Sequence, residues 1–341
     1  MFADLRARAR EVLEPAHWDY FEGGAGDERT LRANEEAFER LRLVPRVLRS
    51  TGPRYLGTTL FGTGLRTPIL VAPTAFHRLA HPDGELATAR GAAAAGTVYV
   101  VSMAATTPVE AIAAVAGPWW LQLYPQPDRD FTAALVRRAE AAGCGALVVT
   151  ADSPVFGRRE RDHRNAFHDL PPGLCCENLR DATGAVRDIV MDAGLGWAGI
   201  DWLRGVTGLP IVLKGVLHPA DAELAVEHGV SGLIVSNHGG RQLDGAVATA
   251  DALPAVAKAV GGRLPVLVDG GIRRGADVLA ALALGADAVL VGRPVLWGLA
   301  AGGADGVRLV LDSLSEDLDR VLALAGFRTP AEVTPDAVAT R

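Results

Sequence analysis

Short apolar runs rich in Val, Ile and Leu recur along most of the chain, and Ala-rich stretches separate them. Nearly all of the runs are continuously apolar, which is typical of parallel strands buried on both faces. The intervening stretches, such as 84–96 and 219–229, have the composition of helices. The eight candidate strands are 68–72, 97–102, 119–124, 146–150, 210–214, 232–236, 265–269 and 288–292. Eight successive βα units predict a closed (β/α)₈ TIM barrel.

One spacing departs from this regularity. The fourth run starts at residue 146 and the fifth at residue 210, about twice the longest of the other spacings. The inserted stretch contains Pro, Gly and mixed charges without a clear period, so we expect a long loop at the catalytic end of the barrel. Such a loop could close over a substrate as a lid, or it could be a solvated excursion without a chemical role.

We expect a single domain built from three parts. Residues 1–67 form an N-terminal cap with helices near 2–13 and 30–41, and residues 68–302 form the barrel. Residues 303–341 carry a terminal helix, expected over 304–325 because Gly326 suits a helix C-terminus. The length of 341 residues and the 49% hydrophobic content are sufficient for one large barrel with such attachments.

Charge and cysteine content exclude several classes of function. The formal net charge of -6 offers no basic face for nucleic acid, and no apolar run approaches the roughly 20 residues of a membrane span. Cys144, Cys175 and Cys176 form neither a disulfide framework nor pairs of metal-binding hairpins. We therefore expect a cytoplasmic protein with reduced thiols, no structural zinc and no nucleic-acid or membrane partner.

Polar residues stand at the end of every candidate strand, where barrel enzymes carry their reacting groups. At the last two strand ends, Gly270, Gly271 and Gly292 would let backbone amides approach an anion. Arg273 and Arg293 would add charge-assisted contacts, so this pair of ends predicts a phosphate site.

The fifth and sixth strand ends carry candidate chemistry. Lys214 follows an apolar run, and it could form an imine with a carbonyl substrate or stabilise negative charge on a reduced cofactor. His238 and Arg241 lie three residues apart, which places a possible general base near a cation suited to a carboxylate. Asp152 could orient His238. The other seven histidines lack metal-ligand spacing, so a catalytic metal is not expected.

Several independent motifs agree on one family. They are SNHGGRQLDG at 236–245, DGGIRRG at 269–275, VGRP at 291–294, PTAFHRLAHPDGE at 73–85, and QLY followed by TAD and GRRE. In order and over nearly the whole chain, these motifs resemble the FMN-dependent (S)-2-hydroxy acid oxidase and dehydrogenase family, whose members oxidise glycolate, lactate or mandelate. The resemblance implies the TIM barrel, bound FMN and oxidation of a 2-hydroxy acid to the 2-oxo acid, with O₂ or another electron acceptor.

The resemblance also implies a role for individual residues. His238 would take a substrate proton, Asp152 would stabilise its protonated form, and Lys214 would favour the anionic reduced flavin. Tyr124 would hydrogen-bond near the reacting hydroxyl, and Tyr20, Arg159 and Arg241 would bind the substrate carboxylate. The residues implied for FMN are Thr74, Ala75, Ser102, Gln122, Thr150, Lys214, Ser236, Asp269, Gly271, Arg273, Gly292 and Arg293. Because Tyr20 lies far upstream, the N-terminal segment would have to fold over the barrel mouth.

Departures from the family pattern bear on the substrate. Relatives that use glycolate resemble each other in a large aromatic residue just after the second-strand serine, where this chain has 103-MAA-105. With Phe76 and Phe156 at the expected pocket edges, this predicts a roomier pocket for a larger or aromatic acid, such as a mandelate-like compound. The insertion lacks a basic, apolar membrane-binding segment, which favours an oxidase over a respiratory dehydrogenase.

Two other functions remain open from the sequence. A Schiff-base aldolase on the same barrel would use Lys214 covalently and need no flavin. A flavin-binding protein without turnover is the other alternative, although every residue expected for catalysis is present. The family resemblance further suggests a homotetramer.

Overall fold

The computed structural model describes residues 2–340 and confirms the predicted barrel. Eight parallel strands close in chain order, with the last strand hydrogen-bonded to the first. These strands are β4 (Ile69–Val71), β5 (Tyr99–Ser102), β6 (Trp119–Leu123), β7 (Leu147–Thr150), β8 (Ile211–Val216), β9 (Gly232–Val235), β10 (Val266–Asp269) and β11 (Ala288–Val291). Each lies within or next to one of the eight apolar runs, because continuous apolar sequence suits a strand buried on both faces.

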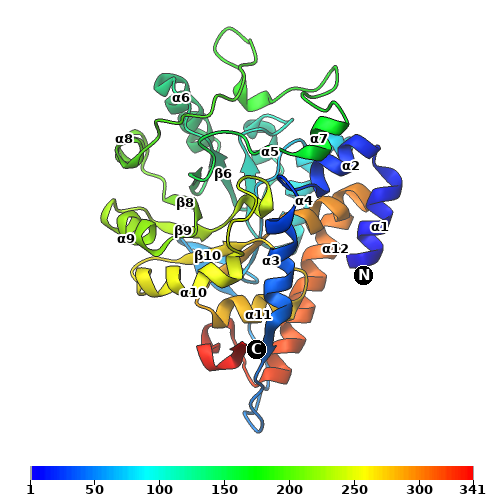
Figure 1. The fold of residues 1–341 in the computed structure, drawn as a ribbon, viewed down its shortest axis with the longest axis vertical. Helices are drawn as coiled ribbons and strands as arrows, with labels where there is room; N and C mark the ends of the chain where they lie inside the picture. The colour runs from blue at the N-terminus through cyan, green and yellow to red at the C-terminus, as the bar shows by residue number, and fades with distance from the viewer. Residues whose placement is uncertain (1, 341) are drawn as a thin grey trace.

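Helices follow the strands and surround the barrel (Figure 1). They are α4 (Gly84–Ala95), α5 (Val109–Ala113), α6 (Arg129–Ala141), α7 (Glu160–Arg164), α8 (Trp197–Val206), α9 (Pro219–Glu227), α10 (Thr249–Val260), α11 (Gly275–Ala283) and α12 (Arg293–Ala325). The predicted helices at 84–96 and 219–229 correspond to α4 and α9. The inserted stretch after β7 contains α7, and α8 then completes the usual βα unit before β8.

Two apolar cores hold the barrel together. One lies between the strands and the surrounding helices, and the other fills the barrel interior with residues such as Trp120, Val148 and Ile234. A hairpin of β2 (Thr58–Leu60) and β3 (Thr63–Leu65) adds Leu60 and Leu65 to the interior core. The interior is therefore a packed core, and open space is left near the strand ends.

The terminal helix differs from its predicted extent of 304–325. The helix α12 begins at Arg293, directly after β11, and its backbone is non-helical at Gly302 and Gly303. The expected helix is therefore the second limb of a longer, interrupted helix. Its end is as predicted, because Gly326 adopts a left-handed conformation with φ of 90° at the C-cap.

The N-terminal segment contains α1 (Phe2–Val12), α2 (Pro15–Glu22) and α3 (Arg29–Arg40). The predicted helices at 2–13 and 30–41 match α1 and α3, whereas α2 was not predicted. In Figure 1 these helices lie along one side of the barrel, and α2 packs against α7 from the inserted stretch. The strand β1 (Leu41–Leu43) pairs with β12 (Val338–Thr340), so the C-terminal strand is joined to the stretch that follows α3.

Short 3₁₀ helices complete the description: η1 (His77–Leu79), η2 (Glu177–Leu179), η3 (His238–Gly240), η4 (Pro330–Glu332) and η5 (Pro335–Ala337). Within residues 2–340, no helix is both long and apolar enough to cross a membrane. Cys144, Cys175 and Cys176 are free thiols, as the sequence predicts.

Candidate active site

A cavity of about 450 Å³ opens at the carboxyl ends of the barrel strands, within the usual size range of cofactor and ligand sites. Three parts of the chain line it: the strand ends, α2 from the N-terminal segment, and the stretch after β7. The expected site residues that line it are Tyr20, Thr74, Ala75, Ser102, Gln122, Tyr124, Thr150, Arg159, Lys214, His238, Arg241, Asp269, Gly271, Arg273, Gly292 and Arg293. Asp152 and Ser236 stand behind this wall, in contact with His238 and Lys214.

His238 lies at the cavity between two polar partners. Its Nδ1 is 2.9 Å from Asp152 Oδ1, and its Nε2 is 3.3 Å from the Tyr124 hydroxyl. The backbone N–H of His238 donates to Ser236 Oγ at 3.1 Å. His238 has a φ of 60°, a conformation that costs energy for a residue with a side chain and is frequent at functional sites. The structure therefore places Asp152 where it can orient the ring and stabilise its protonated form.

The protonation states of Asp152 and Tyr124 are compatible with His238 acting as a base. Burial works to raise the pKa of Asp152, but attraction to His238, the hydrogen bond from His238 and the charge of Lys214 together lower it. Asp152 is therefore a carboxylate at neutral pH. Burial raises the pKa of Tyr124, so its phenol remains a neutral hydrogen-bond donor.

Lys214 is a buried cation at the end of β8. Its Nζ donates to Ser236 Oγ at 2.9 Å and lies 3.2 Å from Asp269 Oδ2. Only 5% of the Lys214 side chain is exposed, so the Asp269 carboxylate replaces much of the contact that its ammonium group would otherwise make with water. The sequence left open whether Lys214 forms an imine or stabilises negative charge. Its contacts with Ser236 and Asp269 are compatible with both roles.

Polar side chains continue around the rim through the ends of β5, β6 and β7. Ser102 Oγ donates to Gln122 Oε1 at 3.2 Å, and Gln122 Nε2 donates to Thr150 Oγ1 at 3.1 Å. All three side chains are buried and line the cavity. Since buried polar groups require partners, such an arc is suited to the polar edge of a bound ring.

Two arginines and a tyrosine form a cationic corner of the cavity. The guanidinium carbons of Arg241 and Arg159 lie 4.9 Å and 5.3 Å from the centre of the Tyr20 ring. Arg241 Nη1 donates to the carbonyl oxygens of Tyr20 and Gly23 at 2.6 Å and 2.9 Å. Burial and the neighbouring charge of Arg159 lower the pKa of Arg241, so this corner favours an anion.

The predicted fold-over of the N-terminal segment is found in the structure. Tyr20 belongs to α2 and yet lines the cavity, in stacked contact with Phe76 at a centroid distance of 5.3 Å. The segment is fixed to the stretch after β7 by Arg161, whose guanidinium pairs with Glu28 at 2.7 Å and with Asp19 at 3.3 Å. Two parts of the chain far apart in sequence therefore complete the mouth of the site.

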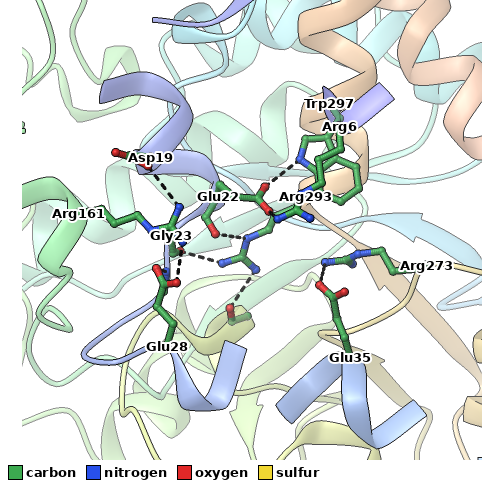
Figure 2. A network of polar contacts seen from close by, with 12 residues as sticks. Arg6, Asp19, Glu22, Gly23, Glu28, Glu35, Arg161, Arg273, Arg293 and Trp297 are labelled. Atoms are coloured by element: carbon green, nitrogen blue, oxygen red, sulfur yellow. Dashed lines mark hydrogen bonds and ion pairs between the residues drawn. The ribbon is translucent and has the colours of Figure 1, made fainter. Parts of the chain in front are cut away.

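The expected phosphate end of the cavity lies against the same segment (Figure 2). Arg293 donates to the carbonyl oxygens of Glu22, Gly23 and Gly239 at 3.2, 2.9 and 3.0 Å. Arg273 Nη2 pairs with Glu35 Oε1 at 2.7 Å. Burial, with the nearby charges of Arg241 and Arg273, lowers the pKa of Arg293 to about 9, so an anion bound beside it would stabilise its charge.

Gly271 shows why this end needs glycine. It has a φ of 86°, and a Cβ atom added to it would meet the carbonyl oxygen of Asn34 on α3 at 2.2 Å. Asn34 also exchanges hydrogen bonds with Asn237, at 2.9 and 2.7 Å. Asn34, Glu22 and Glu35 were not identified from the sequence, because nothing in α2 or α3 marks these residues as neighbours of the barrel rim.

The residues present fit FMN. Asp269 lines the cavity, and its Oδ1 is buried without a hydrogen-bond partner among the described residues, so hydroxyl donors of a sugar-like chain would satisfy it. The arc from Ser102 to Thr150 can hold a polar ring edge, and Arg273 and Arg293 can hold a phosphate. Within residues 2–340 there is no group of His, Cys, Asp or Glu side chains that could bind a metal ion.

Comparison with known proteins agrees with this geometry. The model of the FMN-dependent dehydrogenase family matches residues 9–340. The chain belongs to the FMN-dependent dehydrogenase family. It is 48% identical to L-lactate oxidase of Nostoc sp., covering 93% of this chain and 92% of that protein. It is 46% identical to 2-hydroxyacid oxidase 2 of Rattus norvegicus, covering 98% and 97%.

Solved structures lead to the same family. A structure of mandelate oxidase with (S)-2-phenylpropionate superposes with a TM-score of 0.93 at 45% identity, covering all of this chain and 98% of that one. Family membership identifies the chain as an FMN-dependent oxidoreductase acting on 2-hydroxy acids, so the cofactor and reaction class expected from the motifs are confirmed. A flavin-free aldolase and a non-catalytic flavin protein are not supported.

Proposed function

We propose that this enzyme oxidises (S)-2-hydroxy acids with side chains larger than that of glycolate, aryl groups included, to the 2-oxo acids, and passes the electrons to O₂. The observation that carries the proposal is the juxtaposition at one cavity of a cationic corner, a histidine base and the small side chain of Ala104. Relatives named as lactate, 2-hydroxyacid and glycolate oxidases support O₂ as the electron acceptor.

The cationic corner orients the substrate. Arg241 and Arg159 would bind its carboxylate with charge-assisted hydrogen bonds, and the Tyr20 hydroxyl would add a third donor. Burial raises the pKa of Tyr20, which keeps that hydroxyl protonated. Fixing the carboxylate would in turn fix the positions of the α-carbon and its hydroxyl relative to His238.

His238 would act as the base. Its Nε2 faces the Tyr124 hydroxyl, so a substrate hydroxyl near this pair can give its hydrogen bond to His238 and accept one from Tyr124. As the ring takes up a proton, the Asp152 carboxylate at its Nδ1 stabilises the positive charge. Tyr124 contributes as a neutral donor and not as a second base.

FMN would be held along the strand ends, by Thr74, Ala75 and the arc from Ser102 to Thr150, with its phosphate at Arg273 and Arg293. When bound, FMN supplies the two-electron acceptor that the oxidation requires. Lys214 would stabilise negative charge on the reduced ring, which gives this buried cation a role beyond its contact with Asp269.

The space around the substrate side chain supports a larger acid. Ala104 lines the cavity, whereas Met103 and Ala105 are buried behind it, so only the small Ala104 side chain bounds the cavity at this position. Phe76 and Phe156 line the cavity as predicted, and Phe167, Ile189 and Met191 add apolar surface. Solved structures of mandelate oxidase with phenyl-bearing acids are similar to this chain at TM-scores of 0.93 and 0.92.

An anaerobic titration of the purified flavoprotein tests the substrate assignment. The flavin absorption band should bleach with (S)-mandelate at lower concentration than with (S)-lactate, and glycolate should be the poorest substrate. The (R)-mandelate enantiomer is the matched control and should leave the band unchanged. Preferential bleaching by glycolate would contradict the proposed side-chain size, and admitting air to the reduced enzyme should restore the band with formation of hydrogen peroxide.

We further propose a cytoplasmic homotetramer. The free thiols support a reducing compartment, and the family resemblance supports the assembly. Light scattering coupled to gel filtration should give four times the chain mass of 35.7 kDa, and a monomeric mass would contradict the assembly.

A further inference from the structure

A buried polar cluster lies behind the cavity wall, outside the set of residues used above. We call it the His77 cluster, and its members are His77, Glu85, Thr88, Tyr99, Thr106 and Thr107, all buried. None of the six lines the cavity. The cluster reaches the cavity at Thr74: His77 Nε2 lies 2.6 Å from Thr74 Oγ1, and the His77 ring also has a hydrogen bond with the Thr74 backbone. Thr74 itself lines the cavity at the proposed FMN site.

Glu85, at the start of α4, fixes the position of the histidine. Its Oε1 accepts the backbone N–H of His77 at 3.1 Å and that of Thr106 at 2.8 Å. Its Oε2 accepts the hydroxyls of Thr106 and Thr107 at 2.7 and 2.9 Å. Because both carboxylate oxygens are occupied, the backbone after β4 and the backbone after β5 are held together.

The hydrogen bonds around the His77 ring indicate which of its two nitrogens carries the proton. Two hydroxyls approach Nδ1, that of Thr88 at 2.8 Å and that of Tyr99 at 3.4 Å. The Thr88 hydroxyl has one other acceptor, Gly84 O at the longer distance of 3.5 Å, and the Tyr99 hydroxyl has none among the described residues. If Nδ1 carried the proton, the buried Tyr99 hydroxyl would have no acceptor. Nδ1 therefore accepts, and Nε2 carries the proton.

The ring remains neutral in this arrangement. Burial lowers the pKa of His77, and the nearby Glu85 carboxylate and the hydrogen bond with the Thr74 backbone oppose this shift only in part. A neutral ring with its proton on Nε2 donates to Thr74 Oγ1. The Thr74 hydroxyl then accepts from His77 and retains its own proton, for which no other acceptor is present within residues 2–340. The adjacent cavity is where that proton can be donated.

We propose that His77 is a positioning residue that holds the Thr74 hydroxyl as a hydrogen-bond donor toward bound FMN. A donor at this position would favour the forms of the flavin that carry more negative charge, including the reduced form. Thr74 and His77 would therefore assist Lys214 in raising the reduction potential of the enzyme. This inference rests on the bound FMN and on no assumption about the substrate side chain.

Sulfite is the probe for the first experiment, because its reversible addition to oxidised flavin leaves negative charge on the ring. Titration of the substrate-free holoenzyme, followed at the flavin band, should give a sulfite Kd about tenfold weaker in Thr74→Val and in His77→Phe. The double variant should be no weaker than either single variant, since both remove the same bond. The reduction potential of each variant should fall in parallel.

Matched variants separate positioning from general disruption. In His77→Gln the amide can donate to Thr74 and accept from Thr88, so its sulfite Kd should remain close to the wild-type value. Thr107→Val removes another buried hydroxyl of the same cluster without touching the contact between His77 and Thr74, and it too should leave the Kd unchanged.

Three results would overturn the inference: an unchanged Kd in Thr74→Val, additive losses in the double variant, or an equal loss in Thr107→Val. The Thr74→Val result decides the question even where His77→Phe does not fold. Because these titrations contain no substrate, a failure of the proposed preference for aryl acids would not affect them.

Discussion

The strand rim and the mouth of the site are built in different ways. At the rim, Gln122, Thr150 and Lys214 sit at the ends of neighbouring parallel strands, where the barrel register places Ser102 opposite Gln122 and Thr150 opposite Lys214. At the mouth, Tyr20 and Arg159 come from parts of the chain with no strand register between them, joined by side-chain contacts such as Arg161 with Glu28.

This difference separates two tasks. Residues on closed strands move little, which suits proton and electron transfer to a bound cofactor. Loop-borne residues can change without disturbing the barrel, which suits recognition of different 2-hydroxy acids. His238 lies between the two, because it follows β9 directly but has a strained backbone, and the loop after β7 packs through Gly157 against Arg241 and Gln242, a few residues further along the chain.

Loss of the base should have the largest effect. His238→Ala should retain FMN, because the rim residues are unchanged, and lose at least about 10²-fold in the rate of flavin reduction by substrate. Anaerobic stopped-flow measurement checks the rate, and the absorption spectrum checks flavin content. An unchanged rate of flavin reduction would show that His238 does not take part in the reaction. Loss of flavin would show that the turn containing His238 helps to hold FMN.

The two arginines at the mouth, Arg241 and Arg159, should contribute unequally to binding of the substrate carboxylate. Arg241 is half-buried and donates to carbonyl oxygens, which carry no negative charge, whereas Arg159 is 26% exposed and already pairs with the Asp162 carboxylate at 2.6 Å. Arg241→Leu should therefore lower kcat/KM for (S)-mandelate by roughly 10- to 100-fold, and Arg159→Leu should lower it less. Steady-state kinetics of both variants measures which loss in kcat/KM is larger. Equal losses would contradict the prediction that Arg241 contributes more than Arg159.

A larger side chain at Ala104 should alter the preference among substrates. Ala104→Leu adds side-chain volume where the cavity is bounded by a small residue, so kcat/KM for (S)-mandelate should fall about tenfold while that for glycolate changes little. Met103→Leu is the matched control, since Met103 is buried behind the cavity. Parallel losses for both acids would indicate displacement of the flavin.

The smallest expected effect is on stability. Burial lowers the pKa of His77, so below its ordinary value of about 6.5 the unfolded chain binds a proton that the folded chain does not. Stability is then complete above about pH 6.5 and is lost as the pH falls below it, by at most about 1.4 kcal/mol per pH unit. Urea unfolding between pH 5 and 7 should show a shallower pH dependence in His77→Gln than in the wild type, and identical slopes would contradict a neutral His77.

Much of the fold could be predicted because its signals are local. Each continuous apolar run became a barrel strand, and the left-handed Gly326 ends α12 where the sequence places the end. The first limb of α12 was missed, because it follows β11 directly and is interrupted at Gly302 and Gly303. The helix α2 was also missed, since its 8 residues give little periodicity to detect.

The site was predicted to a similar extent and for similar reasons. Residues at strand ends, including His238 and Lys214, could be named from the strand pattern because parallel strands bring their carboxyl ends to one rim. The upstream Tyr20 was found only through the family resemblance. Glu22, Glu35 and Asn34 were not found at all, since their contacts with Arg293, Arg273 and Gly271 join segments more than 200 residues apart.

The sequence by itself determined the barrel and the kinds of group available for chemistry, because apolar periodicity and strand-end residues are local properties of the chain, and its family resemblance gave the cofactor class. The tertiary structure decided which groups meet. It set Asp152 at 2.9 Å from His238, folded Tyr20 over the mouth, and placed the His77 cluster behind Thr74. Such contacts depend on long-range packing and on the balance of burial and hydrogen bonding, which no short stretch of sequence contains.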